Sequence, residues 1–178
     1  MDILQVWVLL PIDMLERTIR KLKDGVEDGI PEPDPVLEIS VDGYIPDDYI
    51  ADPRYKLELY RRFAGLDYGE KDDLLDEIID RFGEPPEEVE VLWRVACLRA
   101  LCRLLHIRGI SVKPGELRIT FAENAAIDPT ALMKLISEQQ QYMNFKSGVQ
   151  AQLIFRTVKL KTDSLTWLEK NLPRLAFD

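Results

Sequence analysis

Apolar residues recur at steps of three and four along much of the chain, which is the spacing of amphipathic helices. Asp52-Pro53 and Asp128-Pro129 each place an N-cap residue before a proline at the first helical position, and Thr162 or Asp163 caps a last helix. The longest helical stretch has apolar residues around most of its circumference, which indicates a central core helix. The pattern predicts helices over residues 11–23, from 53, from 74 up to Gly83, over 86–107, from 129 and from 163.

Alternating apolar and polar residues predict strands over residues 36–46 and 151–160. Residues 109–122 read as a β-hairpin with Lys113–Glu116 as its turn. The hairpin is antiparallel, and no series of βαβ units is evident. The expected fold class is therefore α+β, a small, mostly antiparallel sheet packed with several helices.

The stretch DGVEDGIPEPDP, residues 24–35, is acidic and rich in glycine and proline, which is the composition of a linker. We therefore expect an N-terminal helix within residues 1–24, a linker over 25–35 and a folded domain over 36–178. A second acidic stretch, residues 65–73, is expected to link two helices of that domain. The apolar stretch ILQVWVLLPI lacks the basic start and the cleavage site of a signal peptide. We interpret it as core-facing chain or as the cut end of a larger protein.

The sequence has 178 residues, of which 46 % are hydrophobic and 31 % are charged, and its net charge is −9. A domain this acidic lacks the basic surface that nucleic acids and acidic membranes require, so we expect it to bind neither directly. Cys97, Cys102 and the single histidine, His106, are too few for a structural zinc site, which needs four ligands. We interpret the cysteines as reduced thiols of a cytoplasmic protein.

The sequence contains no motif of a phosphate-binding loop, a dinucleotide-binding fold or a serine hydrolase. Carboxylates are concentrated between residues 72 and 90, at helix starts and in linkers, where solubility and the helix dipole account for them. Paired carboxylates also bind divalent metals or act as acids and bases. A stand-alone acidic metal-binding or hydrolase domain therefore remains an alternative.

The stretch VDGYIPDDYI, residues 41–50, brackets a proline and two aspartates with aromatic and apolar residues. One interpretation is a structural turn with two tyrosines packed beneath it. The other is a small binding surface, in a module that binds another protein in trans. The residues of that surface would be Tyr44, Asp47, Asp48 and Tyr49.

Four segments of the sequence are similar to the C-terminal domain of the bacterial transcription-repair coupling factor. They are VDGYIPDDYIADPRYKLELYRRFA (41–64), EIIDRFGEPPEEVEVLWRVACLRALCRLLHIRGISV (77–112), LRITFAENAAIDPTALMKLI (117–136) and the final LTWLEKNLPRL. The resemblance runs from about residue 36 to the end. IDMLERTIRKLK (12–23) resembles the helix that closes the family's translocation module.

The resemblance implies a regulatory role without enzymatic activity. Members of the family bind RNA polymerase, UvrA and double-stranded DNA, and an ATPase motor that uses ATP and magnesium drives their translocation. Their C-terminal domain docks on the UvrB-like module of the same chain, hides the UvrA-binding surface and restrains the motor. The motor motifs are absent from this sequence, so we expect a fragment that has no cofactor of its own and lies in the bacterial cytoplasm.

Carried over by position, the family's docking contact falls on Glu77, Asp80 and Arg81. Spacings of three and four residues place these side chains on one face of a helix. A polar patch of both signs on a rigid helix suits a reversible contact between domains, because each exposed ion pair contributes little. The alternative is a solvated face that holds an intrahelical Glu77–Arg81 pair.

Overall fold

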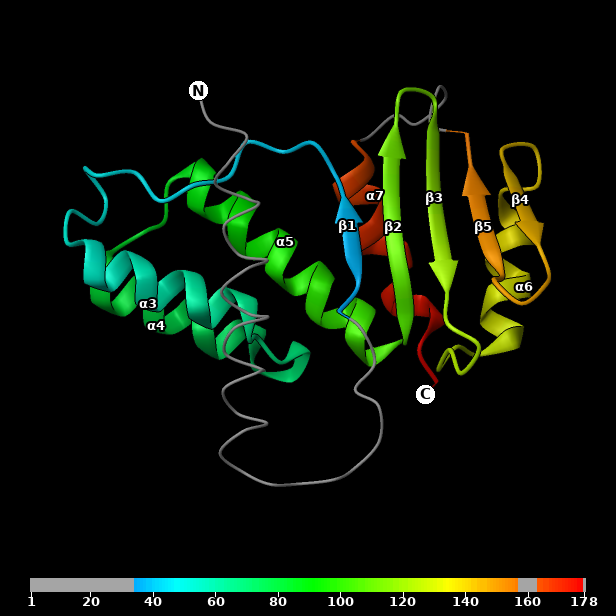
Figure 1. Ribbon diagram of the computed structural model, residues 1–178, viewed down its shortest axis with the longest axis horizontal. Helices are drawn as coiled ribbons and strands as arrows, with labels where there is room; N and C mark the ends of the chain where they lie inside the picture. The colour runs from blue at the N-terminus through cyan, green and yellow to red at the C-terminus, as the bar shows by residue number, and fades with distance from the viewer. Residues whose placement is uncertain (1–33, 157–162, 178) are drawn as a thin grey trace. The chain divides into compact units, whose positions relative to one another are not determined.

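The computed structural model describes residues 34–156 and 163–177 (Figure 1). The predicted helix over residues 11–23, nearly all of the linker and the end of the strand predicted over 151–160 lie outside the described residues. The chain divides into two compact units. The described part of the first is residues 41–100, and the second comprises residues 34–40 and 101 onward.

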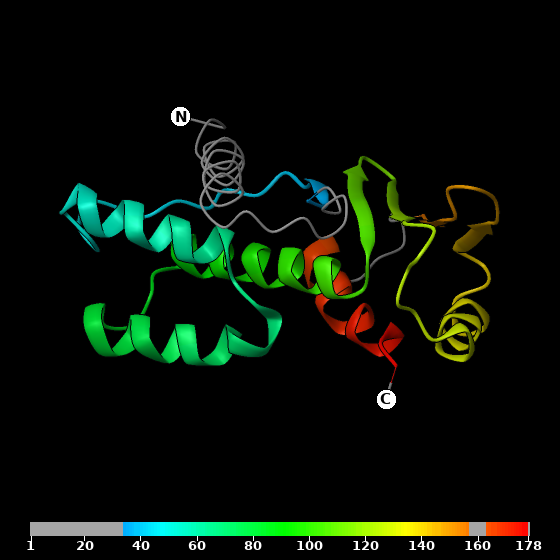
Figure 2. The ribbon, with the colours of Figure 1, turned by 60° about the horizontal axis from the view of Figure 1, so that its bottom comes forward.

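The first unit is helical. It contains α3 (Pro53–Ala64), a short 3₁₀ helix η1 (Tyr68–Glu70), α4 (Lys71–Phe82) and most of α5 (Glu87–Leu104). Figure 2 shows α3 and α4 lying beside this part of α5. Buried side chains from all three helices form a single core, joined by two isoleucines of the preceding segment. The core comprises Ile45, Ile50, Leu59, Phe63, Leu66, Leu74, Ile78, Val89, Leu92, Ala96, Cys97 and Ala100.

The predicted helix starts are confirmed where capping residues marked them. The Asp52 carboxylate accepts a hydrogen bond from the Arg54 amide at 2.8 Å, with Pro53 at the first helical position. The predicted acidic link over 65–73 is shorter than expected, because α4 already begins at Lys71. The core helix predicted over 86–107 ends at Leu104. His106, at a φ of 52°, lies in the left-handed region and turns the chain out of the helix.

The strand predicted over 36–46 was wrong for most of its length. Only β1 (Val36–Glu38) pairs with the sheet. After it, Ile45 is buried among helices, and a Cβ on Gly43 would lie 3.1 Å from the Leu92 side chain. The alternating pattern was therefore produced by extended chain that packs on helices.

The second unit contains a five-stranded sheet in the order β1-β2-β3-β5-β4. β1 is parallel to β2, and every other neighbouring pair is antiparallel. The fold is therefore α+β with a mostly antiparallel sheet, as predicted. The remaining strands are β2 (Ile107–Lys113), β3 (Glu116–Phe121), β4 (Met143–Lys146) and β5 (Gln152–Phe155).

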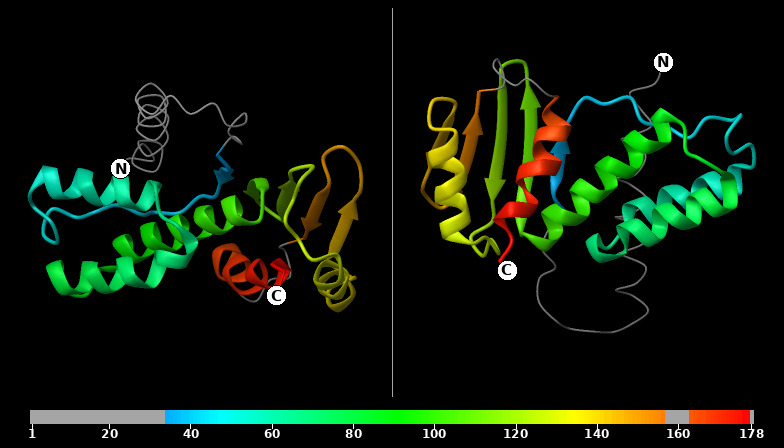
Figure 3. Two further views of the ribbon diagram at one scale, coloured as in Figure 1. Left: turned by 90° about the horizontal axis from the view of Figure 1, so that it is seen from below. Right: turned by 180° about the vertical axis from the view of Figure 1, so that it is seen from behind.

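Two helices, α6 (Pro129–Glu138) and α7 (Ser164–Asn171), lie on the same face of this sheet (Figure 3). A 3₁₀ helix, η3 (Pro173–Leu175), follows α7. The predicted caps Asp128 and Asp163 accept hydrogen bonds from amides of the first turns of α6 and α7. The Phe155 and Trp167 rings stack at 4.9 Å between centroids, which joins β5 to α7. Among the described residues, no helix is both long and apolar enough to span a bilayer.

Candidate docking surface

Two of the three residues expected to dock, Glu77 and Arg81 on α4, belong to an ion-pair network with α3. Arg81 Nη1 lies 3.2 Å from Glu77 Oε1 and 3.2 Å from Glu58 Oε1. On its other side, Glu77 accepts a hydrogen bond from the Arg62 guanidinium. Charges of alternating sign therefore run across the neighbouring faces of α3 and α4 in the order Glu58, Arg81, Glu77, Arg62.

The Arg81 guanidinium also lies against aromatic rings. Its Cζ is 5.0 Å from the Phe82 ring centroid and 5.7 Å from that of Tyr55. Phe82 in turn contacts Tyr49 and Tyr55, with centroids 6.3 and 6.1 Å apart. Two carboxylates and two rings therefore hold the guanidinium in a defined position, although about a third of the Arg81 side chain stays exposed.

Asp80, the third residue, lies beside this network and is exposed. Within the part of the chain that the structure describes, no ion pair involves Asp80. The structure therefore contains the intrahelical Glu77–Arg81 pair and, next to it, a carboxylate whose charge is not neutralised by a neighbour. The surface that includes Tyr55, Glu58, Arg62, Glu77, Asp80, Arg81 and Phe82 is called the α3–α4 surface below.

Ion pairing shifts the pKa values of three charged side chains on this surface. The hydrogen bond from Arg62, and then that from Arg81, hold the pKa of Glu77 below its ordinary value. The hydrogen bonds to Glu58 and Glu77 raise the pKa of Arg81, and the one to Glu77 raises that of Arg62. The carboxylate and both guanidiniums are therefore charged throughout the neutral range.

This shift predicts a pH-dependent contribution to stability. Because the pKa of Glu77 is lowered in the folded state, its contribution is complete above its ordinary value of 4.5 and is lost as the pH falls through the lowered pKa. Between pH 6 and pH 3, the free energy of unfolding should therefore fall further in the wild type than in the isosteric Glu77→Gln variant. Urea titrations at several pH values measure this difference, which should shrink at high salt. Parallel pH profiles would show that the Glu77 pairs do not contribute.

The segment over residues 41–50 forms the predicted turn, but only one tyrosine packs within it. The Ile50 amide donates to the Pro46 carbonyl at 3.1 Å. Tyr49 points toward α4 and donates its hydroxyl to the Gly83 carbonyl at 2.8 Å. Tyr44, in contrast, is 40 % exposed. The turn, in the segment 41–64, and the end of α4, in the segment 77–112, are therefore joined directly.

The two aspartates of the turn differ in their surroundings. Asp47 pairs with Lys56 of α3, and Lys56 also donates to the Ile45 carbonyl at 2.8 Å. Asp48 is exposed, and no ion pair within the described residues involves it. Of the four residues suggested for a secondary surface, Tyr49 and Asp47 make internal contacts, although the Asp47 side chain remains 94 % exposed. Tyr44 and Asp48 face solvent.

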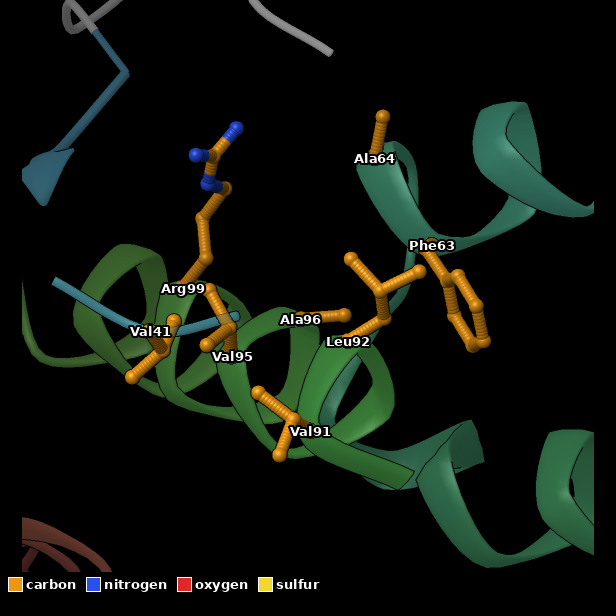
Figure 4. Close-up of a pocket in the computed structure, with 8 residues that line it drawn as sticks. All are labelled: Val41, Phe63, Ala64, Val91, Leu92, Val95, Ala96 and Arg99. Carbon is orange, nitrogen blue, oxygen red and sulfur yellow. The ribbon is translucent and has the colours of Figure 1, made fainter. Parts of the chain in front are cut away.

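The first unit also contains a small apolar cavity next to α5 (Figure 4). Its volume is about 10 Å³, which is room for a single water molecule. This cavity is too small for a substrate or cofactor. It is lined by Val41, Phe63, Ala64, Val91, Leu92, Val95, Ala96 and Arg99. Among the described residues, no group of three or more histidine, cysteine, aspartate or glutamate side chains is arranged to hold a metal ion.

The sequence did not single out the α3 residues of the surface. Tyr55, Glu58 and Arg62 follow one another at steps of three and four, so they share a helix face. That spacing was visible in the sequence. The pairing of this face with Glu77 and Arg81 was not, because it depends on how α3 packs against α4.

The fold and this surface define a small α+β domain with a polar helical face. A model of the family described as "TRCF domain" matches residues 39–132, which is just over half of the sequence. The chain therefore belongs to the TRCF domain family, the family of transcription-repair coupling factors.

The curated relatives carry the same name, transcription-repair-coupling factor. The protein from Bacillus subtilis (strain 168) is 37 % identical over 102 residues, which is 56 % of this chain and 9 % of that protein. The one from Haemophilus influenzae is 30 % identical over 134 residues, 73 % of this chain and 12 % of the relative. The one from Escherichia coli (strain K12) is 27 % identical over 170 residues, 93 % of this chain and 15 % of the relative. The chain thus spans a small part of each relative's length.

A solved structure has the same fold. It is the crystal structure of a C-terminal domain of transcription-repair coupling factor, with a TM-score of 0.66 and 23 % sequence identity. The similarity covers 79 % of this chain and 89 % of that one. The resemblance seen in the sequence and the expected fold class are therefore both confirmed.

Proposed function

We propose that this chain is a regulatory, non-enzymatic domain of a transcription-repair coupling factor. It docks through the α3–α4 surface on the UvrB-like module of the same protein. Docking covers the site that UvrA would bind and restrains the DNA-translocating motor. RNA polymerase, double-stranded DNA, ATP and magnesium are assigned to the other parts of that protein, which acts in the bacterial cytoplasm.

The observation that supports this proposal most is the position of Asp80. It is an exposed carboxylate that forms no ion pair with the described residues, and it lies next to a charge network whose side chains are already ordered by contacts between α3 and α4. An ordered polar surface loses little side-chain entropy when a partner binds. It also remains soluble when the partner leaves, which a large apolar patch would not.

The strength that such a contact needs is modest. Hiding a site in 99 of 100 molecules requires a preference of roughly 2.7 kcal/mol for the docked state. Exposed ion pairs contribute little individually, so a few of them with one aromatic contact are of the right order. Tyr55 is an exposed ring on the surface that can make such a contact. Tyr44 and Asp48, also exposed, are proposed as a secondary contact.

A calorimetric titration tests the proposal. The 178-residue chain is titrated with the purified UvrB-like module of the same organism's coupling factor. We expect one-to-one binding that weakens as salt is raised, because charged groups carry the contact. Magnesium, manganese and calcium chlorides are titrated in parallel. Absence of binding to the module would contradict the proposal, and stoichiometric binding of a metal ion would support the alternative of an acidic metal-binding domain.

A further inference from the structure

Helix α4, which carries the docking residues, is attached at both ends by aromatic side chains from neighbouring segments. At its first residue, the Lys71 carbonyl accepts a hydrogen bond of 3.1 Å from the Trp93 indole of α5. Just beyond its last residue, the Gly83 carbonyl accepts one of 2.8 Å from the Tyr49 hydroxyl. Neither bond is part of the helix's own backbone ladder. Together they fix α4 along its axis relative to the rest of the first unit.

We propose that Tyr49 and Trp93 are positioning residues for docking. By holding the two ends of α4, they place Glu77, Asp80 and Arg81 where the partner module meets them. This inference rests on the docking function proposed above. It adds two residues that do not themselves meet the partner but determine how well the surface fits it.

Tyr49 acts closest to the docking residues. Gly83 follows Asp80 by three residues, and its φ of 84° and ψ of −175° lie in a region that only glycine adopts readily. The Gly83 amide bonds back to the Ile79 carbonyl at 2.9 Å, and the Tyr49 hydroxyl holds the Gly83 carbonyl, where the chain leaves the helix. The Tyr49 ring lies against Phe82, and Phe82 lies beneath the Arg81 guanidinium. A continuous set of contacts thus leads from Tyr49 to Arg81.

The segment that carries Tyr49 is itself firmly anchored. Ile45 and Ile50, on either side of the turn, are each only 3 % exposed. The Ile45 amide donates to the Tyr60 hydroxyl at 3.0 Å, and the Ile45 carbonyl accepts from Lys56. The Tyr49 hydroxyl is therefore presented to α4 from a fixed turn, which a positioning role requires.

The Tyr49→Phe variant tests this role, because it removes the hydroxyl and retains the ring that packs on Phe82. The Gly83 carbonyl is near solvent, so water replaces part of the lost bond. We expect the affinity for the UvrB-like module to fall about twofold to fivefold, the lower part of the roughly twofold to twelvefold range of one ordinary hydrogen bond. Tyr49→Phe combined with Trp93→Phe should weaken binding about tenfold. Amide hydrogen exchange in the last turn of α4 should become faster in both variants.

Trp167→Phe is the control. It removes an indole N–H that donates to the Gln139 side chain at 3.3 Å in the second unit, so the free energy of unfolding falls. Neither this bond nor the stacking of the Trp167 ring on Phe155 involves α4 or the turn that carries Tyr49, so docking should keep its wild-type affinity at temperatures well below unfolding. If a loss of stability were enough to weaken docking, Trp167→Phe would weaken it as Tyr49→Phe does. If Tyr49 positions α4, only Tyr49→Phe weakens docking.

Asp80→Lys distinguishes failure of this inference from failure of the docking proposal. If Asp80→Lys weakens binding while Tyr49→Phe and the double variant leave it unchanged, the positioning role is overturned and docking stands. If Asp80→Lys has no effect on binding, the docking surface is wrong and the positioning role falls with it. If both weaken binding, the effect of Tyr49→Phe should vanish in an Asp80→Lys background, because the surface that it positions is already impaired.

Discussion

Replacing Phe63 by alanine is expected to lower the free energy of unfolding by about 3–5 kcal/mol. Phe63 is only 1 % exposed and lies in the core between α3 and α5. Removing its ring leaves a cavity that rigid helices fill only in part. Domains of this size have a total stability of only about 5–15 kcal/mol, so the variant should be close to unfolding. Urea titration followed by circular dichroism measures the loss.

Phe177→Ala is the matched control for this change. Its ring is 64 % exposed, so the same substitution should alter the free energy of unfolding by less than about 0.5 kcal/mol. Equal effects at the two positions would contradict the assignment of Phe63 to the core of the first unit.

Reversing the charges at Asp80 and Arg81 is expected to weaken docking on the UvrB-like module by about tenfold or more, because like charges would then meet across the contact. Arg81→Glu also places a third carboxylate beside Glu58 and Glu77, so part of its effect arises within the domain. Asp80→Lys alone breaks no ion pair of the described residues and should leave the fold unchanged. Calorimetric titration with the module compares the variants with the wild type.

Glu123→Lys provides the control for net charge. Glu123 is exposed in the loop after β3, in the second unit, and the substitution changes the net charge by the same amount as Asp80→Lys. It should leave the affinity unchanged. If Glu123→Lys weakens binding as much as Asp80→Lys, binding depends on the net charge of the domain, and the assignment of the α3–α4 surface as the docking site is contradicted.

The sequence predicted best those elements whose ends are marked by capping or turn residues. Asp52-Pro53 and Asp128-Pro129 mark helix starts through contacts within a few residues, and the hairpin turn at Lys113–Glu116 is equally local. The strand β4 was missed although Met143 and Phe145 alternate with polar residues, because four residues are at the short limit of a recognisable strand pattern. The end of the strand predicted over 36–46 was misjudged because alternating apolar residues do not reveal whether their segment joins a sheet or packs against helices.

For the candidate surface too, the sequence predicted contacts within a helix but not contacts between segments far apart in the chain. The spacing of Glu77, Asp80 and Arg81 predicted a shared helix face, and the Glu77–Arg81 pair is present. The contributions of Glu58 and Arg62 depend on the packing of α3 against α4, which no local pattern encodes. The hydrogen bond from Tyr49 to Gly83 joins residues 34 positions apart and is equally invisible in the sequence. Whether Glu77, Asp80 and Arg81 meet the UvrB-like module stays a prediction.

The measurement that tests the central claim most directly is the affinity of UvrA for a coupling factor that ends in this chain, with and without Asp80→Lys. If docking hides the UvrA site in 99 of 100 molecules, releasing it raises the apparent affinity by up to about a hundredfold. The account predicts that the variant binds UvrA more tightly than the wild type, approaching the affinity of the isolated UvrB-like module. Equal affinities of variant and wild type, with the domain folded in both, would contradict it.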